Sequence, residues 1–159
     1  MKKIETTLLL LRKDDQILLA LKKRGFGVGK YNGVGGKLEP GETPEEAMIR
    51  ETEEEIGVTP TKYEKMGENV FEELMNEELV FLRFHLYVAT EWLGDPVETE
   101  EMKPYWFNIA KIPYDKMFAD DRYWLPLVLE GKKISGTFKF DEDWHLISYD
   151  IKEIFDKIK

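Results

Sequence analysis

Cysteine, histidine and long apolar runs are all scarce in this 159-residue chain. Cysteine is absent, which excludes disulfide bonds and thiolate metal sites and leads us to expect a reducing, cytoplasmic setting. The apolar run near the N-terminus spans only Leu8 to Leu11, which is too short for a signal peptide or a membrane span. Both histidines, His85 and His145, stand in strand-like segments without metal-ligand spacing, so we expect both to be structural.

Positive charge is also in short supply, with 23 Lys and Arg against 32 Asp and Glu and a net charge of −9. This balance argues against a nucleic-acid polymer as partner, because lysine and arginine contacts to phosphate supply most of that affinity. A small phosphorylated substrate escapes the objection when a divalent cation accompanies it, since the ion offsets both sets of negative charge.

The length and pattern of the chain predict one α+β domain over residues 1–159, without repeats or linkers. A chain of this size buries roughly 70% of its unfolded surface, which is enough for a hydrophobic core. We expect helices at 43–56 and 122–129, and strands at 4–11, 17–21, 63–74, 79–89, 105–107, 133–140 and 145–151. The turn residues at 13–15 predict that the first two strands form a hairpin. We expect a monomer.

The helix expected at 43–56 carries a concentration of carboxylates. Side chains three and four residues apart on a helix lie about 5–6 Å apart, so Glu51 falls beside both Glu54 and Glu55. Three like charges at this spacing repel one another, whereas a hard divalent cation would bind them. Magnesium favours six oxygen ligands at roughly 2.0–2.1 Å. The spacing therefore predicts a metal site for Mg²⁺, with Mn²⁺ able to substitute.

The loop before this helix lets the backbone approach a ligand or metal closely, because three of its residues are glycines: Gly33, Gly35 and Gly36. A glycine carbonyl is then available as a further metal ligand. Thr43 and Glu46 give the capping-box pattern that begins a helix, and Gly57 is typical of a C-cap.

Loop and helix together resemble the signature of the Nudix hydrolases: a glycine, five residues, a glutamate, seven residues, then Arg-Glu-aliphatic-any-Glu-Glu-any-Gly-aliphatic. Residues 36–58 match eight of its nine specified positions. Thr52 is the departure, because the family has a bulky aliphatic residue there, and we expect some lost packing and no lost chemistry. The resemblance implies a mixed β-sheet sandwiched between helices, in an α/β/α arrangement.

A solvated helix in a glutamate-rich chain is the alternative for this segment, and for Glu53 alone it is the preferred interpretation. Solvated helices gain by alternating Glu with Lys four residues apart, yet Arg50 is the only basic residue near the cluster. We therefore favour a metal site. Arg50 is expected to hold a signature glutamate through a bidentate pair rather than to touch substrate.

Segments along nearly the whole chain narrow the resemblance to the oxidised-purine nucleoside triphosphatases: residues 22–27, 31–37, 98–107, 120–127 and 136–140. Members of that branch hydrolyse 8-oxo-dGTP and 2-hydroxy-dATP to the monophosphate and pyrophosphate and so sanitise the nucleotide pool. The resemblance implies a nucleotide pocket lined by Thr7, Lys22, Asn32, Asp120 and Asp121, to which we add Phe26, Phe118, Gly35, Gly36 and Lys37. It implies metal ligands at the Gly35 carbonyl, Glu51, Glu54, Glu55 and Glu101.

The pocket residues also have plain structural explanations. Asn32 can read a base edge bidentately, but Asn before Gly also forms turns. Either Asp120 or Asp121 could cap the following helix, although only one is needed. Two adjacent carboxylates in a pocket can instead share a proton and so both donate to and accept from a purine edge. Lys22 could simply be surface charge, and Phe26 could fill a glycine-rich loop. Thr7 could be present for its strand propensity alone.

Phe118 bears on substrate choice, because the oxidised-purine branch carries tryptophan at this position. Phenylalanine keeps an aromatic face but offers less area, and base stacking on aromatics contributes roughly 1–3 kcal/mol. The resemblance therefore supports hydrolase chemistry more firmly than it supports a preference for oxidised purines.

The expected reaction is attack of a metal-activated water on the α-phosphorus, with a glutamate as base, Glu101 included. A broader Nudix hydrolase of dinucleoside polyphosphates or nucleotide sugars would share the metal site and differ in the pocket. A non-catalytic binding module would keep the fold but should have lost some of the three signature glutamates, and none is missing.

Overall fold

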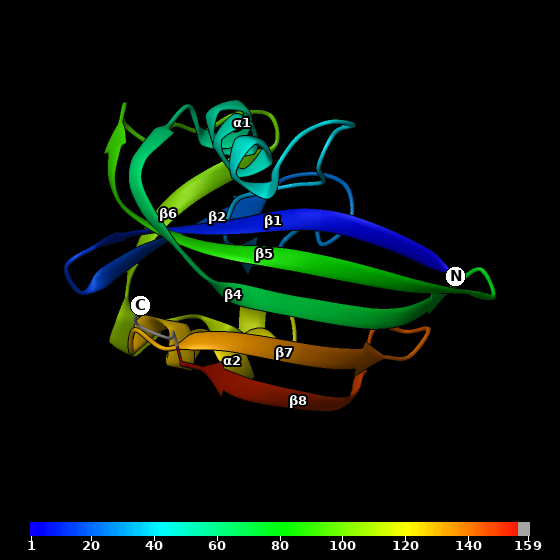
Figure 1. Cartoon of the computed structure of the whole chain (residues 1–159). Helices are drawn as coiled ribbons and strands as arrows, with labels where there is room; N and C mark the ends of the chain where they lie inside the picture. The colour runs from blue at the N-terminus through cyan, green and yellow to red at the C-terminus, as the bar shows by residue number, and fades with distance from the viewer. Residues whose placement is uncertain (156–159) are drawn as a thin grey trace.

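A computed structural model describes residues 1–155, in which eight strands form one mixed sheet with helices on both sides (Figure 1). The strands are β1 (Lys2–Lys13), β2 (Gln16–Lys22), β3 (Tyr31–Asn32), β4 (Thr59–Met75), β5 (Glu78–Leu93), β6 (Met102–Asn108), β7 (Lys133–Phe140) and β8 (Leu146–Ile154). The α-helices are α1 (Pro44–Ile56) and α2 (Asp121–Leu129), and two 3₁₀ turns cover Ile109–Lys111 and Tyr114–Lys116.

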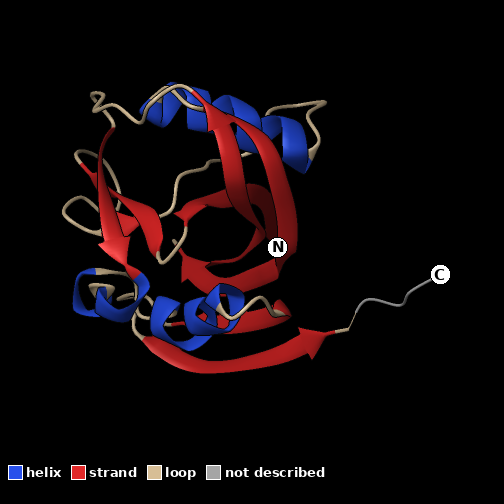
Figure 2. Ribbon diagram, turned by 90° about the vertical axis from the view of Figure 1, so that its left-hand side faces the viewer, coloured by secondary structure: helices blue, strands red, loops and turns tan. Residues whose placement is uncertain are grey.

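The sheet runs in the order β3-β2-β1-β5-β4-β7-β8, with β6 paired to β2. Two pairings are parallel, β1 with β5 and β4 with β7, and the others are antiparallel. Helix α1 contacts β1, β4 and β6, whereas α2 contacts β7. Figure 2 shows helices on opposite sides of the strands. The predicted mixed sheet between helices is confirmed, as is the hairpin of the first two strands.

Strand β1 shows why the sheet has a core on each face. Its run Leu8 to Leu11 is buried throughout, and successive side chains of a strand point to opposite faces. Leu8 and Leu10 join the core that includes Trp124 and Leu125 of α2, while Leu9 and Leu11 join the core beneath α1. A continuous apolar run is typical of a strand covered on both sides.

Helix α1 begins and ends as its sequence predicts. The Thr43 hydroxyl accepts from the Glu46 N–H at 3.1 Å, and the Glu46 carboxylate accepts from the Thr43 N–H at 2.9 Å, which completes the capping box. Gly57 ends the helix with a φ of 73°. Thr52 is fully buried, and its hydroxyl donates to the Met48 carbonyl of the same helix at 2.7 Å, so its polar group is satisfied.

Several strands extend beyond their predicted ends. Strand β4 begins at Thr59 rather than at residue 63, because register shifts between Pro60 and Tyr63 let it pair with β5 despite the proline. A further shift occurs at Gly67, where a Cβ would lie 1.9 Å from the Ile134 carbonyl oxygen on β7. Within residues 1–155, neither helix is long and apolar enough to cross a membrane.

Candidate active site

The glycine loop is held between β1 and α1. The Thr7 N–H donates to the Gly36 carbonyl at 3.0 Å, and the Thr7 hydroxyl lies 3.2 Å from both the N and the O of Gly36. Gly35 cannot carry a side chain, because its φ is 152° and the Thr7 backbone lies against it, whereas a side chain on Gly36 would displace the Glu51 carboxylate. A Cβ on Gly35 would lie 2.1 Å from the Thr7 carbonyl oxygen, and one on Gly36 would lie 2.4 Å from the carboxyl carbon of Glu51. The loop backbone therefore touches both β1 and a signature glutamate.

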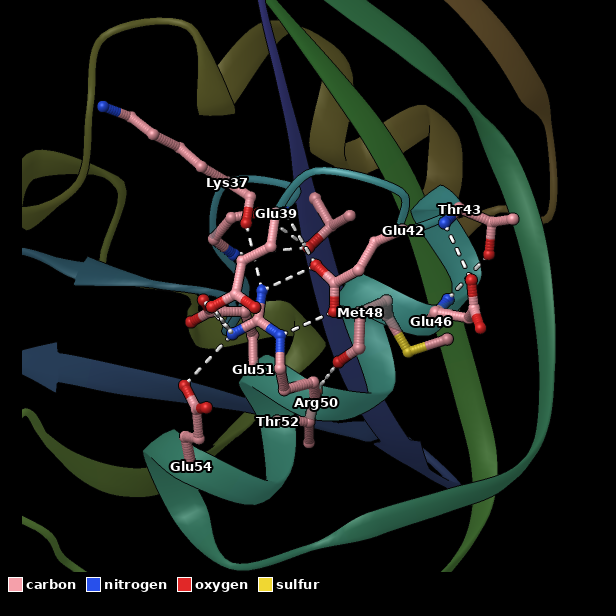
Figure 3. A network of polar contacts seen from close by, with 12 residues as sticks. Lys37, Glu39, Glu42, Thr43, Glu46, Met48, Arg50, Glu51, Thr52 and Glu54 are labelled. Carbon is pink, nitrogen blue, oxygen red and sulfur yellow. Dashed lines mark hydrogen bonds and ion pairs between the residues drawn. The ribbon is translucent and has the colours of Figure 1, made fainter.

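Arg50 occupies the centre of the acidic segment (Figure 3). Its Nε and Nη2 donate to the two carboxylate oxygens of Glu42 at 2.7 and 2.9 Å, and its Nη1 donates to Glu51 at 2.9 Å and Glu54 at 3.2 Å. Nη2 also donates to the Lys37 carbonyl at 3.2 Å. The predicted bidentate pair is confirmed, with Glu42 as partner. Hydrogen bonding to Arg50 lowers the pKa of Glu42 to about 2, so this pair stays ionised at neutral pH.

Glu55 lies on the inner side of the helix and points to the loop. Only 8% of it is exposed, and its Oε1 accepts from the Gly35 N–H at 2.7 Å. Burial raises the pKa of Glu55 to about 8, and the charges of Glu51 and Glu101 raise it further. Burial also raises the pKa of Glu51, to which Glu54 adds repulsion. These carboxylates disfavour their own ionised forms in the absence of a cation.

The donor atoms of this segment are of the type that a divalent metal requires. We call Glu51, Glu54, Glu55 and the Gly35 carbonyl the acidic cradle. All its donors are oxygens, as a hard cation such as Mg²⁺ requires. A cation would also offset the repulsion that raises the pKa of Glu51 and Glu55. When bound, such an ion screens phosphate charge and lowers the pKa of a coordinated water.

Glu101 stands beside the cradle. Its Oε1 pairs with Arg24 Nη2 at 2.5 Å, and this contact lowers the pKa of Glu101. Its charge reaches Glu55, whose pKa it helps to raise. Arg24 contacts only the Oε1 of Glu101, and the assignment of Glu101 to the metal site stays a prediction.

His145 differs from expectation. It precedes β8 instead of lying within it, and within residues 1–155 it forms, with Asp141 and Asp143, the one group of three potential ligand atoms within 4.8 Å of one another. The expectation that His145 lacks carboxylates at ligand spacing is wrong. A tight turn explains the grouping, because Asp141 Oδ1 accepts hydrogen bonds from the N–H groups of Asp143 and His145 at 2.8 and 2.9 Å.

His85 is buried in the sheet, and its Nε2 lies 2.8 Å from Oε1 of Glu5. These contacts are those of a structural residue.

A cavity of 490 Å³ opens next to the cradle, between the sheet and the start of α2. It is lined by every residue predicted for the nucleotide pocket: Thr7, Lys22, Phe26, Asn32, Gly35, Gly36, Lys37, Phe118, Asp120 and Asp121. We call it the base cavity. These residues come from β1, β2, β3, the two glycine-rich loops and the start of α2, so the fold gathers segments more than a hundred residues apart.

Asp120 and Asp121 are each only 3% exposed, and neither serves as the helix cap. Asp120 occupies the N-cap position without a side-chain capping bond, and its Oδ2 instead accepts from Trp124 Nε1 at 2.8 Å. Its Oδ1 and the Oδ2 of Asp121 are buried without partners. Burial raises the pKa of Asp120 to about 6, and burial followed by repulsion from Asp120 raises the pKa of Asp121. Burial therefore favours protonation of this pair.

The aromatic wall of the cavity differs from a simple stacking platform. Phe118 stacks on Phe26 with ring centroids 5.7 Å apart and planes 13° apart, and Lys30 Nζ lies 5.5 Å from the centroid of the Phe118 ring. Trp144 closes the same cluster at 4.8 Å from Phe26. Asn32 Oδ1 accepts from the Gly33 N–H at 2.9 Å. Asn32 therefore makes a local contact with the following glycine and also lines the cavity.

Sequence reasoning missed several residues of the cavity. Lys30 and Trp144 flank the aromatic wall, and Asn69, Phe71 and Glu73 line the cavity from β4. A signal existed for the last three. They occupy alternate positions of a strand, so a buried Phe71 implies that the polar residues two positions away face the same core.

Comparisons with known proteins agree with this geometry. The family model of the NUDIX domain matches residues 1–128. The chain therefore belongs to the Nudix family and is a Nudix hydrolase.

Particular relatives share almost the full length. The chain is 43% identical over 150 residues to an oxidized purine nucleoside triphosphate hydrolase of Danio rerio, covering 94% of this chain and 95% of the relative. It is 41% identical over 148 residues to the mouse protein of the same name, covering 93% and 94%. The crystal structure of a mutator MutT protein from Bacillus halodurans matches with a TM-score of 0.82 at 28% identity, covering 93% of this chain and 97% of that one.

Proposed function

We propose that this Nudix hydrolase converts purine nucleoside triphosphates with an oxidised base to the monophosphate and pyrophosphate, with Mg²⁺ as the metal. The observation that carries the proposal is the buried Asp120-Asp121 pair, whose unpartnered oxygens line the base cavity. The names and 41–43% identities of the two vertebrate relatives support the same substrate class.

The chain's own residues divide the work of binding. The cradle holds the phosphate end with its metal, and Arg50 keeps Glu51 and Glu54 oriented. Lys22 and Lys37, both in the cavity wall, supply positive charge near the phosphates. With one shared proton, the aspartate pair both donates to and accepts from the base. Such a pair distinguishes purines by the order of donors and acceptors on their edge.

A nucleotide panel tests the proposal. Initial rates on 8-oxo-dGTP, 2-hydroxy-dATP, dGTP, dATP and dCTP are compared with those on a dinucleoside polyphosphate and a nucleotide sugar, with products identified by chromatography. We expect the highest kcat/KM on the oxidised purines, with monophosphate and pyrophosphate as products. A higher value on the dinucleoside polyphosphate or nucleotide sugar would overturn the substrate assignment and leave the Nudix chemistry standing.

Magnesium is tested by removal. Chelation should abolish turnover, and added Mg²⁺ should restore it, with Mn²⁺ as the comparison ion. Full activity in chelator would contradict the assignment of the cradle to a metal.

Four wider expectations belong to the same proposal. We infer that residues 1–159 act as one domain, in support of which β7 and β8 continue the sheet formed by the earlier strands. A monomeric state, a cytoplasmic location and the lack of a nucleic-acid polymer as partner stay predictions from the sequence. Light scattering measures the oligomeric state directly.

A further inference from the structure

Strand β4 presents two polar side chains to the base cavity. Asn69 is 1% exposed and Glu73 is 2% exposed, and both line the cavity together with Phe71 between them. Residues two apart on a strand point to the same face, so all three project from one side of β4. We call Asn69 and Glu73 the β4 pair.

Each member of the β4 pair has one buried oxygen without a hydrogen-bond partner. Among the described residues, four buried side-chain atoms have none: Asn69 Oδ1, Glu73 Oε2, Asp120 Oδ1 and Asp121 Oδ2. All four belong to residues that line the same cavity. Buried polar atoms in native proteins nearly always have partners, so four orphans around one cavity indicate a ligand that supplies them.

The neighbouring strand leaves room for this arrangement. Gly136 of β7 is the register partner of Asn69, and a Cβ at Gly136 would lie 2.5 Å from Asn69 Oδ1 and 2.8 Å from Cε2 of Phe138. Gly136 does not have a positive φ, so its backbone conformation does not require glycine. A side chain at this position would instead collide with the amide of Asn69, which the glycine leaves in place at the cavity wall.

Glu73 has no cation to pair with in the described part of the chain, and burial alone raises its pKa. A neutral carboxyl offers an O–H donor beside a carbonyl acceptor, and the amide of Asn69 offers an N–H donor beside a carbonyl acceptor. Each side chain is thus complementary to a ligand edge on which a donor and an acceptor stand next to each other.

Oxidation at C8 creates such an edge on a purine. Unmodified guanine presents only acceptors, N7 and O6, on its major-groove edge. In 8-oxoguanine, N7 carries a hydrogen and C8 carries a carbonyl, so a donor and an acceptor become neighbours. With the Asp120-Asp121 pair engaged on another edge of the base, the β4 pair is left to read this one.

We propose that Asn69 and Glu73 determine specificity by hydrogen bonding to the donor and acceptor that C8 oxidation places on a purine. The inference rests on the proposed function and adds to it the residues that distinguish an oxidised from an unmodified base. It also assigns the two edges of the base to two different parts of the chain, the start of α2 and strand β4.

The test compares Asn69→Leu, Glu73→Leu and Glu73→Gln with the matched control Glu72→Gln. Glu72 is the next residue of β4, is half-buried and does not line the cavity. The readout is kcat/KM for 8-oxo-dGTP divided by kcat/KM for dGTP. Binding of 8-oxo-dGMP and dGMP in the absence of metal, measured by calorimetry, provides a second readout that does not depend on turnover.

We expect each leucine variant to lower the kcat/KM ratio about tenfold, since each removes hydrogen bonds to the oxidised edge alone. Affinity for 8-oxo-dGMP should fall by the same factor, and affinity for dGMP should stay within about threefold. Glu73→Gln should keep most of the ratio, because an amide retains a donor beside an acceptor, and Glu72→Gln should leave it unchanged.

An unchanged ratio in folded Asn69→Leu and Glu73→Leu proteins, or an equal loss on both substrates, would overturn this inference while leaving the proposed function intact. A wild-type enzyme that does not favour oxidised purines in the nucleotide panel would overturn both. Melting temperatures identify a variant that fails to fold. If Asn69→Leu fails to fold, the pair Glu73→Gln and Glu73→Leu decides, because equal ratios in these two proteins contradict a role for hydrogen bonding. If Glu73→Leu fails to fold, Asn69→Leu decides, because an unchanged ratio in that protein overturns the inference.

Discussion

The acidic cradle and the base cavity are neighbours of opposite character. The cradle comes from one short stretch of sequence, and its charges are already engaged by Arg50 and by the Gly35 N–H. The cavity is assembled from distant segments, and it contains all four orphaned buried atoms of the described residues. The protein thus organises its own phosphate end and leaves the base end for the substrate to complete.

Removal of one cradle carboxylate should have the largest effect. We expect Glu55→Gln to lower kcat roughly a hundredfold or more on every substrate, because the cradle acts on the phosphates and ignores the base. The fold should persist, since the amide can still accept from the Gly35 N–H. Turnover and melting temperature measure this, with Glu53→Gln on the solvent side of α1 as control. Unchanged turnover would contradict the metal site.

Changes in the aspartate pair should instead separate substrates from one another. Asp120→Asn and Asp121→Asn should each lower kcat/KM for oxidised purines about ten- to a hundredfold, the loss expected for a hydrogen bond to a charged group. The magnesium dependence and the rate on dCTP should stay unchanged. The exposed Asp115→Asn serves as control. Equal losses on purines and dCTP would show that the pair is structural or catalytic.

Arg50→Lys tests whether the cradle depends on its organiser. Lysine keeps the charge but loses the fork that binds both oxygens of Glu42, so Glu51 and Glu54 lose orientation. We expect kcat to fall about tenfold and the Mg²⁺ concentration for half-maximal rate to rise, as for other groups that orient metal ligands. Substrate preference should not change. A shift in preference would mean that cradle and cavity are less independent than their contacts indicate.

The smallest expected effect is a pH dependence confined to the cavity. The pKa of Asp120 rises from 3.8 to about 6 on burial, and that of Asp121 rises as well, so the folded protein binds these protons more tightly than the unfolded chain. The contribution of Asp120 to stability is complete below about pH 4 and is lost as the pH rises through about 6, and that of Asp121 is lost as the pH rises through its own raised pKa. Melting temperatures between pH 4.5 and 8 should fall less steeply for Asp120→Asn/Asp121→Asn than for wild type. Parallel curves would exclude the shared proton.

The same contrast explains what the sequence could predict. Cradle residues lie within one loop and one helix, where spacing alone places them, so Arg50, Glu51 and Glu55 could be assigned without a structure. Five of the ten pocket residues, among them Thr7 and Asp121, were predicted through the resemblance, because no local pattern links these two residues. Asn69 and Glu73 escaped both routes. The buried Phe71 between them was a signal, because alternate residues of a strand share a face, but only the structure shows that this face lines the cavity.

Element boundaries were harder to predict than element identity. The start of β4 was missed because Pro60 reads as a strand breaker, whereas register shifts absorb it. The 3₁₀ turns at Ile109–Lys111 and Tyr114–Lys116 have no hydrophobic period to reveal them. These turns nevertheless lead the chain to Phe118, so an irregular connection sets the position of a cavity residue.

Gly36 has a meaning that goes beyond its lack of a side chain. Its backbone is bonded to Thr7 in the cavity wall, and its Cα lies against Glu51 of the cradle. One residue thus forms the shared boundary of two compartments and fixes the spacing between them. The distance between the two compartments is therefore set by main chain, which a rotamer change cannot shorten.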